Sequence, residues 1–182
     1  LLVVTAALAL AAPVAPAMAD AHSEQAHAPS LADVLAHERR DEDRARDQYR
    51  HLAETMAFFQ IEPDMTVAEV APGGGWYTRI LAPYVSEEGQ YVGVGFGPEA
   101  AAALGEDFVA RVKEGAATFS EKQAEGTGVA AEKLPYYFTN ELPEEMVGTV
   151  DRVLMMRMMH NLKRWGVADA EIEGLFAALK PG

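Results

Sequence analysis

The stretch at residues 66–84, TVAEVAPGGGWYTRILAPY, decides the fold of this chain. It opens with a β-branched, apolar run that carries the acid Glu69, passes through the glycine-rich segment 71–75, and continues with apolar residues at helical spacing. Glycine permits positive φ angles and close approach of a ligand, and the first turn of a helix presents free backbone N–H groups. The stretch therefore predicts a strand, a tight turn and a helix, with a small ligand over the turn.

The same stretch resembles motif I of the class I S-adenosylmethionine-dependent methyltransferases, in which an acid and a spacer precede three glycines at alternating positions. Glu69 falls on the acid and Gly73 and Gly75 on the second and third glycines, while Ala71 stands in place of the first. The longer string PGGGWYTRILAPY is similar to a group of predicted exported methyltransferases, in which Trp-Tyr-Thr follows the glycines.

The resemblance implies an α/β, Rossmann-like class I methyltransferase fold with a parallel central sheet. It also implies that S-adenosylmethionine is held over Ala71, Gly73, Gly74 and Gly75, with Glu69 contacting the methionine end or bracing the turn. Apolar runs predict strands at 65–70, 91–94, 134–139 and 149–159, and helical spacing predicts helices at 30–60, 76–85, 98–104, 106–122 and 169–179. Because the family fold has seven strands, we expect it to be truncated here after the fourth strand and its helix.

Polar residues follow the third and fourth predicted strands. Asn140 and Glu141 stand where the resemblance implies a contact to adenine, with a plain polar turn as the alternative. His160 lies just beyond the fourth strand, at the edge where open α/β sheets bind ligands, and histidine is a residue type suited to proton transfer. We therefore predict His160 and Tyr77 as candidate general bases, needed only if the methyl acceptor must lose a proton.

The second predicted strand ends at Gly95, where the resemblance implies an acid that binds both ribose hydroxyls. Loss of a charged acceptor removes roughly 1.5 to 3 kcal/mol of binding. Gly93, Gly95 and Gly97 also form G-x-G-x-G, which differs from the G-x-G-x-x-G of dinucleotide-binding folds. Because of this difference, an NAD(P)-dependent oxidoreductase is the weaker alternative to a methyltransferase.

The segment 30–60 carries apolar residues at helical spacing opposite a charged face. The resemblance implies that this lead-in helps to close the cofactor pocket, so that Arg46, Arg50 and His51 would line the site. The alternative is an ordinary solvated face with ion pairs along the helix.

Residues 1–19, LLVVTAALALAAPVAPAMA, carry no charge and end in a small-x-small cleavage pattern. This predicts a secretory signal peptide whose basic n-region is missing, followed by a flexible mature N-terminus at 20–29 and a methyltransferase-like domain at 30–182. We therefore expect a periplasmic or secreted protein.

The composition limits the partners of the chain. Its 182 residues are enough for one core, and a net charge of −13 argues against nucleic acid as a direct partner. The absence of cysteine excludes disulfides, thiolate metal sites and a lipoprotein anchor, so we predict neither a metal site nor a stable membrane anchor.

Two functional hypotheses follow. The first is a methyltransferase that uses S-adenosylmethionine on an unknown acceptor. The second is an exported, non-catalytic protein that binds a small molecule or acts as a scaffold while keeping the methyltransferase fold, because an exported protein meets little S-adenosylmethionine.

Overall fold

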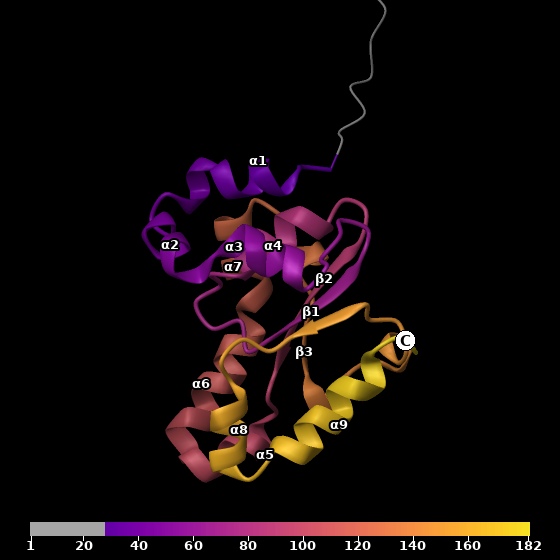
Figure 1. Cartoon of the computed structure of the whole chain (residues 1–182). Coiled ribbons are helices and arrows are strands. Elements are labelled where there is room, and N and C mark those ends of the chain that lie inside the picture. Colours follow the sequence, from indigo (N-terminus) through magenta and orange to yellow (C-terminus); the bar gives the residue numbers. More distant parts are fainter. Residues whose placement is uncertain (1–27) are drawn as a thin grey trace, which may run out of the picture.

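The computed structural model describes residues 28–182 (Figure 1). Its centre is a sheet of four parallel strands in the order β3-β2-β1-β4. The strands are β1 (Thr66–Val70), β2 (Gln90–Gly95), β3 (Tyr136–Phe138) and β4 (Arg152–Leu154). Because all of the strands are parallel, their carboxyl ends meet at one edge of the sheet, where open α/β sheets bind ligands. The predicted α/β fold with a parallel sheet is confirmed.

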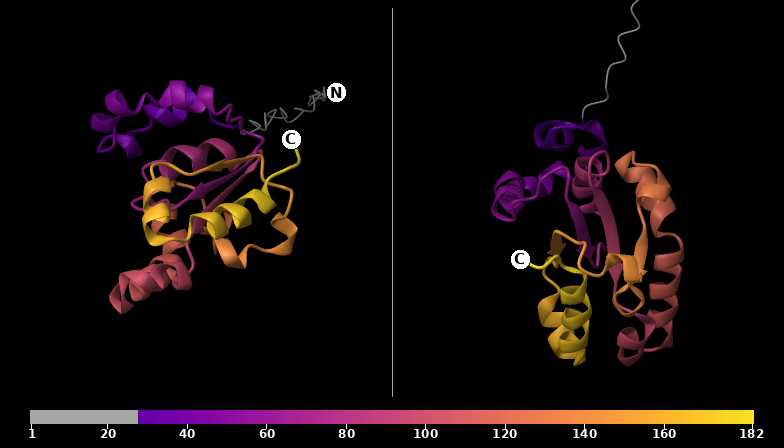
Figure 2. Two further views of the ribbon diagram at one scale, coloured as in Figure 1. Left: turned by 60° about the horizontal axis from the view of Figure 1, so that its bottom comes forward. Right: turned by 90° about the vertical axis from the view of Figure 1, so that its right-hand side faces the viewer.

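Helices cover both faces of the sheet (Figures 1 and 2). They are α1 (Leu31–Ala36), α2 (Asp47–Arg50), α3 (Leu52–Phe58), α4 (Thr78–Val85), α5 (Pro98–Ala101), α6 (Glu106–Ala117), α7 (Phe119–Thr127), α8 (Met159–Trp165) and α9 (Ala168–Ala178). In the right-hand view of Figure 2, α8 and α9 lie on one side of the sheet and α6 and α7 on the other.

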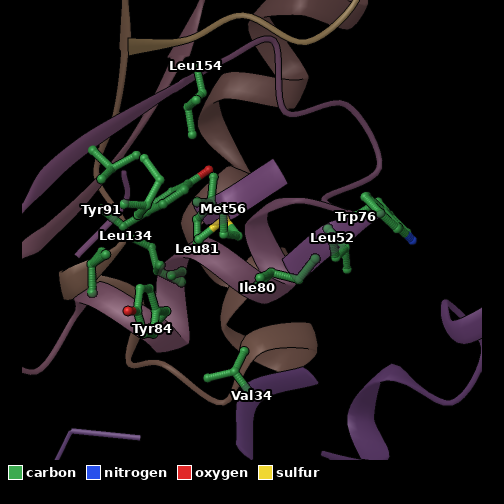
Figure 3. Packing of buried hydrophobic residues seen from close by; sticks show 14 of the residues in the cluster. Val34, Leu52, Met56, Trp76, Ile80, Leu81, Tyr84, Tyr91, Leu134 and Leu154 are labelled. Atoms are coloured by element: carbon green, nitrogen blue, oxygen red, sulfur yellow. The ribbon is translucent and has the colours of Figure 1, made fainter. Parts of the chain in front are cut away.

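Alternating residues of the strands supply two buried clusters. Val67 and Tyr91 pack with side chains of α1, α3, α4 and α7, and Figure 3 shows Ile80 and Leu81 of α4 among them. On the opposite face, Val92 packs with other strand residues and with Leu175 of α9. Because both faces of the sheet are covered, β1 and β2 are buried along almost their whole length.

The prediction of one helix over 30–60 is wrong. Three short α-helices and two 3₁₀ turns occupy this segment, and His51 adopts the left-handed conformation between α2 and α3, with φ +46°. The break lets α3 turn inward and bury Met56. The side chain of Arg40 is buried as well, because its guanidinium binds Asp47 and the carbonyl of Leu35.

The predicted helix over 106–122 is divided at Thr118 into α6 and α7. The Thr118 hydroxyl donates to the carbonyl of Glu114, and the next residue, Phe119, turns into the core. Helix α7 packs against α4, whereas α6 has no buried residue and projects from the rest of the molecule (Figure 2, left).

Beyond α9 the chain returns to the outer side of β4. Leu179 forms a parallel bridge with Val150, and Lys180 binds the carboxylate of Asp151 at 2.6 Å. The predicted signal peptide at 1–19 and most of the predicted flexible segment at 20–29 lie outside the described residues. Among residues 28–182, no helix has the length and apolar character needed to cross a membrane.

Candidate functional site

The turn after β1 keeps the backbone shape that the motif requires. Gly73 and Gly75 have φ angles of +59° and +76°, and Ala71 has a φ angle of +54°. The left-handed conformation costs an L-residue roughly 1 to 2 kcal/mol, because its β-carbon crowds the following carbonyl. Ala71 therefore adopts a glycine-like conformation at the position where the resemblance implies glycine.

The glycines of the turn have different roles. A β-carbon on Gly75 would overlap the side-chain carbonyl oxygen of Gln123 in α7, and the φ angle of +76° would strain any other residue at this position. A β-carbon on Gly74 would meet nothing within 4 Å, and one on Gly73 would meet only the carbonyl of Ala71, at 3.8 Å. Gly73 and Gly74 therefore face open space over the turn.

Glu69 braces the turn from beneath. Its carboxylate accepts hydrogen bonds of 2.7 Å from the hydroxyls of Thr78 in α4 and Tyr91 in β2, and all three side chains are buried. Burial raises the pKa of Glu69 from 4.5 to about 7, against the lowering effect of these two hydrogen bonds. The arrangement fixes the start of α4 relative to the two central strands.

Two cavities adjoin the turn, and Ala71, Pro72 and Met158 line both of them. The first has a volume of about 450 Å³, and we call it the cationic cavity; its lining includes Arg46, Arg50, Gly74, Trp76, Tyr77, Arg79, Arg157 and His160. The second has a volume of about 380 Å³, and we call it the aromatic cavity; its lining includes Gly73, Gly95, Phe96, Phe108, Phe119, Tyr136 and Trp165.

An ion pair holds the N-terminal segment beside the turn. The guanidinium of Arg79 binds both carboxylate oxygens of Asp43, at 2.6 and 2.8 Å, and also donates to the carbonyl of Gly74 at 2.9 Å. The hydrogen bond to Asp43 raises the pKa of Arg79. Because both partners are largely buried, this contact fixes the wall of the cationic cavity more firmly than an exposed pair would.

Trp76 anchors the arginines of this wall. The guanidinium carbons of Arg40, Arg46 and Arg50 lie 5.9, 5.3 and 5.4 Å from the centre of its ring, within the range of cation–π attraction. The structure thus brings Arg46 and Arg50 to the cavity. It does not bring His51 there, because the His51 side chain is exposed and lies 3.9 Å from Glu54.

The glycines of β2 accommodate a tyrosine. A β-carbon on Gly95 would overlap the hydroxyl of Tyr136, and one on Gly93 would lie 2.8 Å from the Tyr136 ring. A β-carbon on Gly97 would lie 2.6 Å from the amide oxygen of Asn140. Packing against Tyr136 therefore accounts for Gly93 and Gly95 of the G-x-G-x-G pattern without a dinucleotide.

Tyr136 also occupies the place where a side chain at residue 95 would lie. Its ring packs against Phe119, with 4.7 Å between the ring centroids, and its hydroxyl has no hydrogen-bond partner among residues 28–182. Burial raises the pKa of Tyr136, so the hydroxyl remains protonated at neutral pH. A neutral hydroxyl thus stands where the resemblance implies an acid.

The comparisons with known proteins bear on the fold. No model of a protein family and no curated protein matches the chain. Among solved structures, a SAM dependent methyltransferase from Aquifex aeolicus is similar at a TM-score of 0.51 and 19% identity, over 84% of this chain and 69% of that chain. The chain has the class I methyltransferase fold. A second similar structure, the CurJ carbon methyltransferase, has a TM-score of 0.42 and 14% identity, over 85% of this chain and 40% of that chain.

On this methyltransferase fold, the two candidate bases lie together. Tyr77 follows the glycine turn and His160 lies in the first turn of α8, and both line the cationic cavity. Asn140 and Glu141 line neither cavity. The 3₁₀ turn at Thr139–Glu141 exposes both side chains, and the Asn140 amide donates to Glu99 at 2.8 Å.

Tyr136, Arg157 and Trp165 are among the residues of the site that sequence reasoning missed. Tyr136 pairs in register with Gly93, and this register between segments far apart in the chain is not visible in the sequence. Arg157 has a φ angle of +61° just after β4, and nothing in the local sequence marks it. Trp165 is the last residue of α8, and in the sequence it cannot be told from an apolar residue of any amphipathic helix.

Proposed function

We propose that the protein is a methyltransferase that binds S-adenosylmethionine across the two cavities. The observation that carries the proposal is the pairing of a charged and an aromatic cavity on either side of one glycine turn. The donor has a charged amino-acid end and a heteroaromatic adenosine end, which match the two cavities in kind. When bound, it supplies an electrophilic methyl group.

The aromatic cavity suits the adenosine. Phe96 and Phe108 lie edge-on to Trp165, at centroid distances of 6.3 and 6.4 Å, and form apolar walls for a flat base. The buried indole N–H of Trp165 has no hydrogen-bond partner in the described part of the chain, so a base nitrogen at this wall would satisfy it. The Tyr136 hydroxyl takes the place of the ribose-binding acid.

The cationic cavity suits the amino-acid end. The open face of Gly74 allows close approach to the backbone, and Arg46 or Arg50 supplies a guanidinium group for the carboxylate. Glu69 keeps the turn in place through Thr78. Positioning of this kind accounts for much of the rate that an enzyme can add to a displacement reaction.

His160 and Tyr77 remain the candidate bases for an acceptor that must lose a proton. His160 is exposed at the rim of the cavity, where an incoming acceptor would meet it. Neither residue is required if the acceptor atom already carries a free lone pair.

An exported, non-catalytic binding protein with the same fold is the second candidate. The observation in its favour is Gly95, which removes the charged ribose contact and replaces it with a neutral hydroxyl. This candidate also predicts nucleoside binding but no methyl transfer, and it keeps the predicted periplasmic or secreted location.

Calorimetric titration tests the proposal. Purified protein is titrated with S-adenosylmethionine and S-adenosylhomocysteine, with NADH as the control ligand. We expect micromolar binding of both methionine derivatives and none of NADH. Failure of both to bind to a protein with a cooperative melting transition would contradict the proposal, and binding of NADH alone would favour the oxidoreductase.

A further inference from the structure

Three arginines of the cationic cavity lack a carboxylate partner. Arg46, Arg50 and Arg157 line it and form no ion pair with any acid among residues 28–182. Arg79, the fourth arginine of the lining, is neutralised by Asp43. In a chain with a net charge of −13, such a group of unpaired cations at one cavity marks an anion-binding surface.

The cavity supplies little negative charge of its own. Glu69 is the one carboxyl in its lining, and this carboxyl is 3% exposed and already bonded to Thr78 and Tyr91. Since burial raises its pKa to about 7, much of it is neutral near pH 7. The partial negative charge of Glu69 cannot balance the positive charges of three guanidinium groups.

The backbone of Arg157 has an uncommon conformation at the lining of the cationic cavity. Its φ angle of +61° is a conformation that a non-glycine residue keeps only where its surroundings impose it, and such residues cluster at functional sites. Arg157 follows β4 and stands in the loop that leads to His160. The arginine and the candidate base thus lie close together in the chain, at the same cavity.

The methyl donor cannot balance these charges. Its carboxylate and ammonium cancel, and its sulfonium leaves one net positive charge. Binding it beside three unpaired guanidinium groups adds like charge, which Coulomb repulsion disfavours even near a protein surface. A further anion is needed at the same cavity.

We propose that the methyl acceptor carries an oxyanion, a carboxylate or a phosphate, that Arg157 binds in the cationic cavity together with Arg46 or Arg50. Guanidinium groups bind either oxyanion through paired hydrogen bonds. The inference rests on the proposed function and adds a class of acceptor to it: a small anionic molecule, because the cavity of about 450 Å³ must also hold the amino-acid end of the donor.

Charge coupling between donor and anion provides the test. S-adenosylmethionine and S-adenosylhomocysteine are titrated in chloride and then in phosphate or acetate of equal ionic strength. We expect phosphate or acetate to tighten S-adenosylmethionine binding about fivefold, at the low end of usual coupling because the arginines are partly solvated. Binding of S-adenosylhomocysteine, which has a neutral sulfur, should change about twofold or less.

Matched variants locate the effect. Arg157→Gln should abolish the anion-induced tightening while leaving S-adenosylhomocysteine affinity within about twofold. Lys122→Gln removes the same charge from an exposed site on α7 and should keep the tightening. Phosphate that tightens and acetate that does not would specify a phosphate-bearing acceptor, and the reverse a carboxylate.

Two results would overturn the inference, and they are distinguishable. If both nucleosides bind but neither anion has an effect, or the effect persists in Arg157→Gln, the anionic acceptor is wrong while the methyltransferase remains. If neither nucleoside binds to the folded protein, the proposed function fails and this inference with it.

Discussion

The two cavities beside the glycine turn are built differently. The wall of the cationic cavity comes from the N-terminal segment and is tied to α4 by the Asp43–Arg79 pair. The outer wall of the aromatic cavity comes from α6, which has no buried residue, and from α8. In the proposed complex, one ligand end therefore meets a wall anchored to the core, and the other meets α6, which has no buried residue, and α8, which buries only Leu162. The comparison indicates that the charged end is positioned more strictly than the aromatic end.

Among the predicted changes, closing the cationic cavity alone should have the largest effect, and this effect is on ligand affinity. The β-carbon added by Gly74→Val would meet no atom within 4 Å, so the new side chain enters the open space over the turn. We expect S-adenosylhomocysteine to bind about 100-fold more weakly, a loss near 3 kcal/mol. Adenosine, which needs only the aromatic cavity, should keep its affinity, and calorimetry measures both ligands.

Thermal melting supplies the control for Gly74→Val. The variant should melt within a few degrees of the native protein, whereas Gly75→Val should melt much lower because of its overlap with Gln123. Equal weakening of S-adenosylhomocysteine and adenosine by Gly74→Val would show that the two cavities are not independent.

The carboxyl of the cationic cavity should make stability depend on pH. Glu69 titrates near 4.5 when unfolded and at about 7 when folded, because it is buried. Between these values the folded state binds one more proton than the unfolded state, so the free energy of unfolding falls as pH rises, by roughly 3 kcal/mol in all. Denaturant titrations at pH 5 and pH 8 measure this fall.

Glu69→Gln tests the origin of that pH dependence. The amide does not titrate, so the variant should lose most of the fall between pH 5 and pH 8. Glu171 in α9 also has a raised pKa because of its burial, and it contributes in the same direction. If the fall in the free energy of unfolding is unchanged in Glu69→Gln and absent in Glu171→Gln, Glu171 and not Glu69 causes the pH dependence, which would contradict the prediction.

Introducing an acid into the aromatic cavity at residue 95 should destabilise the protein while Tyr136 is present. Gly95→Asp would overlap the Tyr136 hydroxyl, and we expect a destabilisation of about 2 kcal/mol, as for other overpacked sites. The double variant Gly95→Asp, Tyr136→Ala should be more stable than the sum of the single effects by about 1 kcal/mol. Strict additivity in denaturant titrations would show that the two side chains do not compete for space.

The smallest effect concerns the residue between the cavities. Ala71→Gly removes a left-handed alanine that costs roughly 1 to 2 kcal/mol, and the greater freedom of unfolded glycine offsets about 0.5 to 1 kcal/mol of this. The variant should be more stable by less than about 1 kcal/mol. The control Ala110→Gly, at an exposed site within α6, should lose about 1 kcal/mol. A loss at both positions would contradict the strain at Ala71.

The local sequence pattern was sufficient to predict the central part of the fold. The β1–turn–α4 unit was predicted because strand propensity, glycine chemistry and helical spacing all act within a few residues. Arg46 and Arg50 were expected at the site from the resemblance, since the local charge pattern alone also allowed an ordinary solvated face. The breaks at His51 and Thr118 were not predictable, because burial of Met56 and Phe119 overrides a helical pattern that continues through both.

The aromatic half of the site could not be predicted in the same way. Tyr136 reaches the cavity only because β3 pairs with β2 in the register that places it opposite Gly93. Contacts between segments far apart in sequence depend on register, which single-residue patterns do not specify. Asn140 was predicted at the site but lines neither cavity, because the 3₁₀ turn at Thr139–Glu141 exposes its side chain.

The most direct measurement is a crystal structure of the protein with S-adenosylhomocysteine. The account predicts the adenine in the aromatic cavity beside Phe108 and Trp165, the ribose at Tyr136, and the carboxylate in the cationic cavity beside Arg50. A ligand confined to one cavity, bound with its ends exchanged, or bound away from the glycine turn would contradict the claim that one amphiphilic ligand spans both cavities.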